Sequence, residues 1–387
     1  IISGDNVLVK KILIVTERRA DYSKFRPVLN EIKKSKKLDY YLVVTGSHLL
    51  KDNGLTINEI KHDGFKISKK FHMYSKIKDD SGAEMVYGLS KSIYHLTKTI
   101  KKIKPDIILA GFDIGANLAA AIVGAHMNIL VAHMEGGEIT GTIDESIRHA
   151  TTKFSHIHFV THKEAKDRLI RMGENPKFIH IVGNPSLDSI KTFKKIPISK
   201  LEKEFSIDLR KPLFLILQHT VTSEVGKIDI YMKKTIDAIK ELNVQSLLIY
   251  GNADAGSKKI LKLIKQSKIK QYSSLTFVKY ANLLSRCTAL VGNSSSGIME
   301  APFLKIPSIN IGTRQTGRLH AESVIDVGYN KNEIKNALLK VLHDKKFQNK
   351  LKRTTSIYGS GNSAKKIVKI LEQLDLKKIP IQKRLFE

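Results

Sequence analysis

The sequence NILVAHMEGGEITGTIDESIRHA, residues 128–150, carries the pattern that decides the fold. Its first seven residues are mostly apolar and predict a buried strand, and the glycines that follow predict a turn into a helix starting near Asp144. Glu135 therefore comes at the carboxyl end of a strand, the edge where open α/β sheets bind their ligands. Asp144 could serve only to favour the helix dipole. The gathering of four acids, two histidines and three glycines from His133 to Ala150 favours a functional site instead.

Strand and helix patterns alternate outward from this stretch in both directions. Strands are predicted at residues 11–16, 40–46, 106–111, 156–161, 212–220, 246–250, near 275–278 and in the segment after 289. Helices are predicted at residues 84–104, 163–172, 227–242, 258–268 and 363–374. This β-α-β-α order predicts an α/β protein with parallel sheets that carry helices on both faces.

The alternating pattern weakens between residues 191 and 212, where lysines and a proline replace it. We therefore predict two Rossmann-like domains, residues 1–190 and 191–362, followed by a C-terminal helix and tail, residues 363–387. The first ten residues, IISGDNVLVK, are expected to be a poorly ordered lead-in. A chain of 387 residues is long enough for two hydrophobic cores.

The formal net charge of +29 raises the question of a nucleic-acid partner. The lysines recur in pairs on several predicted helices, with no single basic stripe, no tryptophan and no zinc-ligand spacing. We therefore expect solvated helix faces and no nucleic-acid partner. No apolar run is long enough to cross a bilayer, so no membrane partner is expected. Cys287 is the only cysteine, which excludes an internal disulfide and favours a cytoplasmic location.

Charged residues also follow other predicted strands in the first half. Arg19 and Lys24 lie in the loop and first turn of the first predicted helix, where cations are unusual unless an anion docks between them. Asp113 lies at a strand-to-helix turn, as either a helix N-cap or a carboxylate at the rim of the pocket that holds Glu135. His48 and the other histidines of the following loop region are assigned no role.

The second half has its own candidate site at strand ends. His219 ends the first strand of this half, and the loop from Gly292 to Gly297 opens a helix whose amides and serine hydroxyls could hold a phosphate. The loop lacks the ending of a P-loop. The candidates for binding a nucleotide here are Ser294, Ser295, Gly297, Glu300 (for a ribose diol), Arg314 and Arg318.

Together these motifs closely resemble the hydrolysing, non-phosphorylating UDP-N-acetylglucosamine 2-epimerases of sialic-acid-type sugar biosynthesis. The resemblance covers nearly the whole chain. It rests on RRADYSKFRPVL (18–29), HMEGGEITGTIDESIRHA (133–150), GNPSLD (183–188), LQHT (217–220), GNSSSGIMEAP (292–302) and NIGTRQTGR (310–318).

The resemblance implies a glycosyltransferase type B fold, in which two Rossmann-like domains face a deep cleft and the last helix crosses back to the first domain. It implies that Asp113, Glu135 and Asp144 are the catalytic acids. It places Arg19, Lys24, His219, Ser294, Ser295, Glu300 and Arg318 at nucleotide and phosphate positions, with Arg314 beside them. The expected partner is a UDP-sugar, with no metal and no cofactor, in a homo-oligomer of two or four chains. The family commonly has GDR where this chain has Phe112, Asp113 and Ile114, and this departure puts the exact sugar in doubt.

The implied reaction inverts C2 of an N-acetylhexosamine and releases UDP through a glycal. It needs several carboxylates for proton transfer, and crowding is expected to raise the pKa of one of them. The departing diphosphate needs positive charge and helix-end amides, which Arg19, His219, Arg318 and the helix start at Gly297 could supply. Four alternatives stay open: a hydrolysing epimerase of nucleotide-linked N,N'-diacetylbacillosamine, a non-hydrolysing epimerase, a glycosyltransferase of the same fold, and a non-catalytic nucleotide-sugar or nucleic-acid binder.

Overall fold

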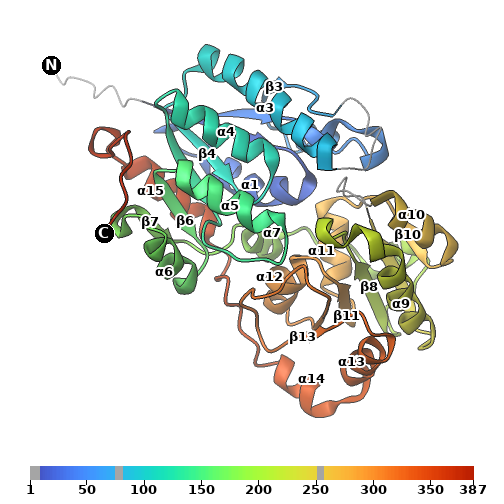
Figure 1. Ribbon diagram of the computed structural model, residues 1–387. Helices are drawn as coiled ribbons and strands as arrows, with labels where there is room; N and C mark the ends of the chain where they lie inside the picture. Colours follow the sequence, from blue (N-terminus) through green and yellow to red (C-terminus); the bar gives the residue numbers. More distant parts are fainter. Residues whose placement is uncertain (1–8, 75–81, 251–256) are drawn as a thin grey trace.

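The computed structural model describes residues 9–74, 82–250 and 257–387, and it contains two parallel β-sheets, each covered by helices (Figure 1). The first sheet has the strand order β3-β2-β1-β4-β5-β6-β7 and the second has the order β10-β9-β8-β11-β12-β13. The strands of the first sheet are β1 Lys10–Thr16, β2 Leu38–Val44, β3 Ile67–Lys70, β4 Ile107–Gly111, β5 Leu130–Met134, β6 Ile157–Val160 and β7 Ile179–Ile181. Those of the second are β8 Leu213–Leu217, β9 Gln245–Ile249, β10 Lys270–Tyr272, β11 Ala289–Gly292, β12 Ser308–Ile311 and β13 Val324–Val327. The predicted fold class is confirmed.

Helices connect successive parallel strands. In the first half they are α1 Arg19–Ile32, α2 Ile57–His62, α3 Gly82–Ile103, α4 Gly115–His126, α5 Ile143–Phe154, α6 Lys163–Arg171, α7 Ser186–Thr192 and α8 Ile198–Phe205. In the second half they are α9 Ile228–Lys240, α10 Ser257–Gln266, α11 Phe277–Leu284, α12 Ser296–Phe303, α13 Lys331–His343, α14 Lys345–Leu351 and α15 Ser363–Gln373. None of the helices in the described ranges combines the length and apolar composition that crossing a bilayer requires. The predicted boundary after residue 190 falls within α7, and the lead-in at residues 1–8 lies outside the described residues.

Both faces of each sheet are buried, which explains the unbroken apolar runs in the strands. In β1, Ile12 and Ile14 contribute to one core cluster, while Leu13 and Val15 contribute to the cluster on the opposite face. Successive side chains of a strand point to opposite faces, so one short run supplies two cores. The second sheet is enclosed in the same way by two further clusters.

The last helix packs on the first domain, although it follows the second in sequence (Figure 1). Ile367 and Leu371 of α15 belong to the same buried cluster as Val28 and Leu29 of α1. Lys10 adds a polar link, because its Nζ donates to the carbonyl oxygens at the end of α15. The C-terminal helix therefore holds α1, which carries Arg19 and Lys24, from the side away from the cleft.

The predicted strand near residues 275–278 is wrong. β10 ends at Tyr272, and α11 begins at Phe277. The segment is rich in β-favouring residues, but Thr276 caps the helix by accepting a hydrogen bond from the Lys279 amide. Phe277 and Ala281 are then buried at helical spacing. The loop expected around His48 also contains short helices and β3, and His48 is buried between the hydroxyls of two threonines.

The strand order of each sheet reverses once, and these reversals locate the site. In the first sheet it reverses between β1 and β4, and in the second between β8 and β11. Loops at such a switch point diverge to opposite faces of the sheet and leave a crevice beyond the carboxyl ends of the strands. The predicted residues Asp113, His219 and Ser294 follow β4, β8 and β11 directly.

Candidate functional site: an interdomain cleft

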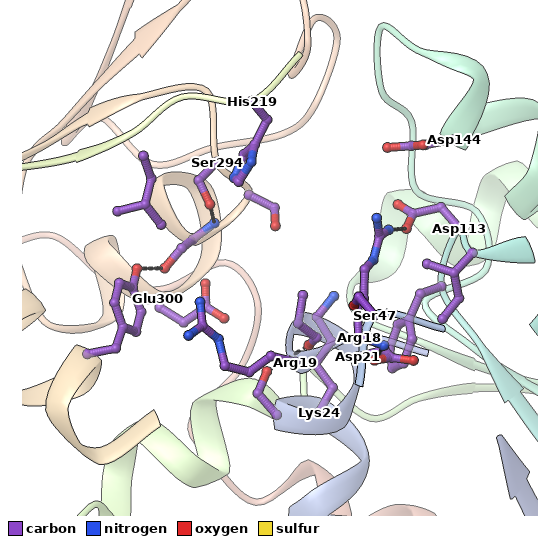
Figure 2. Close-up of a pocket in the computed structure, with 18 of the residues that line it drawn as sticks. Arg18, Arg19, Asp21, Lys24, Ser47, Asp113, Asp144, His219, Ser294 and Glu300 are labelled. Carbon is purple, nitrogen blue, oxygen red and sulfur yellow. Dashed lines mark hydrogen bonds and ion pairs between the residues drawn. The ribbon is translucent and has the colours of Figure 1, made fainter. Parts of the chain in front are cut away.

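A cleft of about 1380 Å³, open solvent included, lies where the two switch points face each other. Every predicted site residue lines the cleft except Glu135 and Gly297. Figure 2 shows Asp113 and Asp144 on one side and His219, Ser294 and Glu300 on the other. Arg18, which precedes α1, and Arg19 and Lys24 of α1 lie near its base.

Asp113 is held between two guanidinium groups. Its Oδ1 lies 3.2 Å from Nη2 of Arg18, and its Oδ2 lies 2.5 Å from Nη2 of Arg148, a side chain with no exposed surface. Burial opposes ionisation of Asp113, but the charges of Arg148 and Arg18 outweigh it and hold its pKa below the usual range. Asp113 is therefore a carboxylate at neutral pH. The sequence analysis assigned no role to Arg18 or Arg148, although they lie within the quoted motifs at residues 18–29 and 133–150.

Glu135 lies behind the cleft wall, in a strained turn. It has a φ of 61°, in the left-handed region, and its amide donates to the carbonyl oxygen of Phe159. Its carboxylate is buried, 2.7 Å from Nζ of Lys24, and it accepts a 2.9 Å hydrogen bond from Nδ2 of Asn184. Lys24, predicted at a phosphate position, lines the cleft and forms an ion pair with this acid. Asn184 lies in the GNPSLD motif, which had no individual role in the prediction.

Asp144 joins the two domains. Its Oδ2 lies 3.4 Å from Nη2 of Arg314, and the amide of Gly141 donates to the carbonyl oxygen of Arg314. Thr142 caps α5 by accepting a hydrogen bond from the Asp144 amide. A Cβ on Gly141 would lie 2.1 Å from the carbonyl oxygen of Thr313, so glycine is required here by the close approach of two backbones. The loop that leads to Asp144 is therefore packed directly on the other domain.

Glu138 is the buried link behind this contact. Its carboxylate lies 3.0 Å from Nε2 of His162 and 3.5 Å from Nε of Arg318, and it accepts a hydrogen bond from Thr161. Burial by itself raises the pKa of Glu138. The hydrogen bond from His162 and the charge of Arg318 lower this pKa by a larger amount, so that the net value is about 2. Arg318, predicted to bind the diphosphate, is thus oriented at the cleft by an acid that the sequence placed in the cluster without a role.

We expect the stability contributed by Glu138 to disappear in acid. Its folded pKa of about 2 lies below its ordinary value of 4.5, so the contribution is present above pH 4.5 and is lost as pH falls towards 2. Glu138→Gln should lower the free energy of unfolding by about 3 kcal/mol at pH 7 and by about half of that at pH 3. Urea unfolding at both pH values measures this, with exposed Glu164→Gln as control. An equal difference at both pH values would contradict the link.

The carboxylates do not crowd one another as the sequence suggested. Asp113 is paired with arginines, Glu135 with Lys24, and Asp144 with Arg314. The expectation that crowding raises the pKa of one of these acids does not apply to Asp113, because nearby cations outweigh its burial. Burial raises the pKa of two other acids that line the cleft, Asp21 of α1, to about 6, and Glu300 on the opposite wall. Oε2 of Glu300 has no hydrogen-bond partner among the described residues.

The opposite wall offers hydrogen-bonding groups and one arginine from α1. Arg19 reaches across to the second domain, where Nη1 donates to Oγ of Ser274, 2.6 Å away, and to the carbonyl oxygen of Leu275. Burial and the neighbouring arginines, chiefly Arg314, lower the pKa of His219 well below its usual value. His219 is therefore neutral at pH 7, so among the groups predicted to receive the diphosphate it is suited to hydrogen bonding, and the positive charge belongs to the arginines.

The serine loop before α12 is partly as predicted. Ser294 and Ser295 line the cleft at the start of the helix. Gly297 faces the sheet: a Cβ there would lie 2.2 Å from Oγ of Ser308 on β12. Its amide donates to the carbonyl oxygen of Ser294 within the first turn. Gly297 therefore lets the helix pack closely on the strand, and its predicted contact with a ligand stays a prediction.

The departure from the family pattern beside Asp113 creates an apolar border. Phe112 has a φ of 69°, a conformation that glycine adopts more readily, and its ring packs on Phe25 and under Nζ of Lys24. Ile114 is buried and precedes α4. Both line the cleft, so apolar surface flanks the carboxylate on either side. Within residues 9–74, 82–250 and 257–387, no group of three or more histidine, cysteine, aspartate or glutamate side chains is placed to hold a metal ion.

Comparison with known proteins agrees with this geometry. A sequence model of the UDP-N-acetylglucosamine 2-epimerase family matches residues 30–372. The UDP-N,N'-diacetylbacillosamine 2-epimerase (hydrolyzing) of Legionella pneumophila is 33% identical over 95% of this chain and 97% of its own. The UDP-N-acetylglucosamine 2-epimerase of Neisseria meningitidis is 35% identical over 88% of this chain and 89% of its own. A crystal structure of UDP-GlcNAc 2-epimerase from Neisseria meningitidis, bound to UDP-GlcNAc, has the same fold, with a TM-score of 0.81, 20% identity and coverage of 93% and 99% of the two chains.

Proposed function

Because this chain belongs to the UDP-N-acetylglucosamine 2-epimerase family, we propose that it is a hydrolysing 2-epimerase that converts UDP-GlcNAc and water to N-acetylmannosamine and UDP. The observation that carries the proposal is the division of the cleft. On the side of the first domain lie carboxylates that are ion-paired with arginine or lysine side chains. On the side of the second domain lie serine hydroxyls, a neutral histidine and a carboxylate oxygen of Glu300 without a hydrogen-bond partner among the described residues. A sugar ring and a nucleotide need these two environments.

In this proposal the second domain binds UDP. The hydroxyls of Ser294 and Ser295 and the ring of His219 donate hydrogen bonds to the diphosphate, which Arg314 and Arg318 neutralise. Glu300 accepts hydrogen bonds from the ribose hydroxyls, which satisfies its buried oxygen. Arg19 closes the nucleotide end, because it already connects α1 to the second domain.

The first domain performs the chemistry on the sugar. Departure of UDP builds positive charge at C1, and loss of the C2 proton then gives a glycal. Asp113 is held as a carboxylate by Arg18 and Arg148, so it is suited to stabilising that charge and to accepting a proton. Addition of water to C1 and return of a proton to the other face of C2 complete the reaction, with Glu135 and Asp144 as the remaining proton-transfer groups.

The product formed in D₂O tests the proposal. We expect the purified protein to convert UDP-GlcNAc to UDP and free N-acetylmannosamine that carries deuterium at C2, as followed by NMR. Release of N-acetylglucosamine with its C2 proton retained would indicate simple hydrolysis and contradict epimerisation. Accumulation of UDP-linked N-acetylmannosamine would indicate a non-hydrolysing enzyme.

A second substrate is favoured by the apolar border of Asp113. Phe112 and Ile114 suit a sugar that carries a methyl group where N-acetylglucosamine carries a hydroxymethyl group, as in N,N'-diacetylbacillosamine. The similarity to the Legionella pneumophila enzyme supports the same alternative. In a competition experiment with both UDP-sugars, a higher kcat/KM for the bacillosamine derivative would decide for it.

A further inference from the structure

The end of the chain lies against the far ends of two catalytic elements. Nζ of Lys383 donates to the carbonyl oxygens of Thr152, at 2.9 Å, and Ser155, at 2.8 Å, at the C-terminus of α5. The last carbonyl groups of a helix have no partner within the helix and carry partial negative charge. An ammonium group held there caps α5 at the end opposite Asp144.

A second contact of the tail reaches β5. Nε2 of His156 donates to the carbonyl oxygen of Ile381, at 3.0 Å, while Nδ1 of His156 accepts a hydrogen bond from the amide of Val131. The amide of His156 also donates to the carbonyl oxygen of Val131. Val131 is near the start of β5, and the strand leads directly to Glu135. The tail therefore contacts the C-terminus of α5 directly and the start of β5 through His156, and these two elements lead to Asp144 and Glu135.

A buried acid fixes the lysine in this place. Oε2 of Glu174 lies 2.5 Å from Nζ of Lys383, and the same carboxylate binds Lys153 and His158. Its side chain is only 1% exposed. The amide of Phe386 donates to the carbonyl oxygen of Gly173, next to Glu174. This charged cluster lies outside the cleft and has no part in the proposed chemistry. Its contacts can therefore act on the reaction only by fixing the position of α5.

We propose that Lys383 is a positioning residue, which holds α5 so that Asp144 and Arg148 stay in register with Asp113 across the cleft wall. The proposal rests on the proposed function of these residues. A helix of this length spans about 18 Å and transmits a shift of one end to the other. Arg148 meets Asp113 at 2.5 Å, so a displacement of α5 directly disturbs that carboxylate.

Three variants test the positioning role. We expect Lys383→Met, which keeps the apolar stem but removes the charge, to lower kcat about tenfold while KM stays within about twofold. Lys383→Arg should restore most of the lost kcat, because it returns a cation to the helix end. Lys378→Met is the matched control, since Lys378 belongs to the same tail but is 78% exposed and contacts Asp375. Hydrogen exchange of the amides in α5 should accelerate in Lys383→Met alone.

The outcomes separate the two proposals. An unchanged kcat, or unchanged exchange in α5, for Lys383→Met would overturn the positioning role. An equal loss in Lys378→Met would also overturn it, because it would show a general effect of tail charge. Assays well below the unfolding temperature of each variant separate a fall in kcat from a loss of folded protein. Failure of the wild type to turn over any UDP-sugar would contradict the proposed function, and exchange in α5 would still test the contact.

Discussion

Glu135→Gln is expected to reduce turnover of the UDP-sugar by about 10²–10⁴-fold, because an amide cannot exchange protons with the sugar. The glutamine keeps the size of the side chain and can still accept a hydrogen bond from Asn184. The Kd for UDP should change by less than about threefold, since the groups proposed to hold UDP belong to the opposite wall. Steady-state kinetics and calorimetric titration with UDP measure both quantities.

The control for this variant is Glu164→Gln, which removes an exposed carboxylate from α6 and should leave turnover unchanged. Near-normal turnover in Glu135→Gln would refute the role of Glu135 in proton transfer. Loss of UDP binding together with turnover would point instead to a disturbed cleft. Lys24 makes that second outcome informative, because it loses its charged partner in this variant.

Asp113→Asn is expected to lower kcat about 10³-fold and also to destabilise the fold. The substitution removes the carboxylate charge that Arg18 and Arg148 share. The fully buried guanidinium of Arg148 then loses this opposite charge and keeps its hydrogen bond to the carbonyl oxygen of Glu138. We therefore expect the melting temperature to fall as well. Asp229→Asn, which removes an exposed carboxylate at the start of α9, is the control and should change neither quantity.

The pH profile gives a second test of Asp113. Its pKa is held below the usual range, so the wild-type enzyme should keep this carboxylate ionised throughout mildly acidic conditions. Any acid limb of kcat above about pH 5 must then come from another group. In Arg18→Met, the pKa of Asp113 should rise, which should add a loss of kcat at acid pH that the wild-type enzyme lacks. An acid side of the profile identical to that of the wild type would contradict the assignment of Arg18.

Sequence patterns located the cleft because they report where strands end. Asp113 and His219 each follow a buried run directly, so their place at the carboxyl edge of a sheet follows from local alternation. The segment at residues 275–278 was misread because β-favouring residues also suit the buried face of α11. Glu135 and Gly297 lie at predicted strand and helix ends, but neither lines the cleft. The side chain of Glu135 is buried behind the cleft wall, and Gly297 lets α12 pack closely on β12.

The sequence by itself determined the two α/β domains and the residue types at each strand end, because both depend on periodicities within short segments. Only the tertiary structure decided the partners of those residues. Asp144 meets Arg314 across 170 positions, and Lys383 reaches the end of α5 from the far end of the chain. The pKa of a carboxylate depends on the charges within a few ångströms of it, and domain docking sets those distances. The charge state of the site therefore depends on the tertiary structure, whereas the residue types that form the site can be read from the sequence.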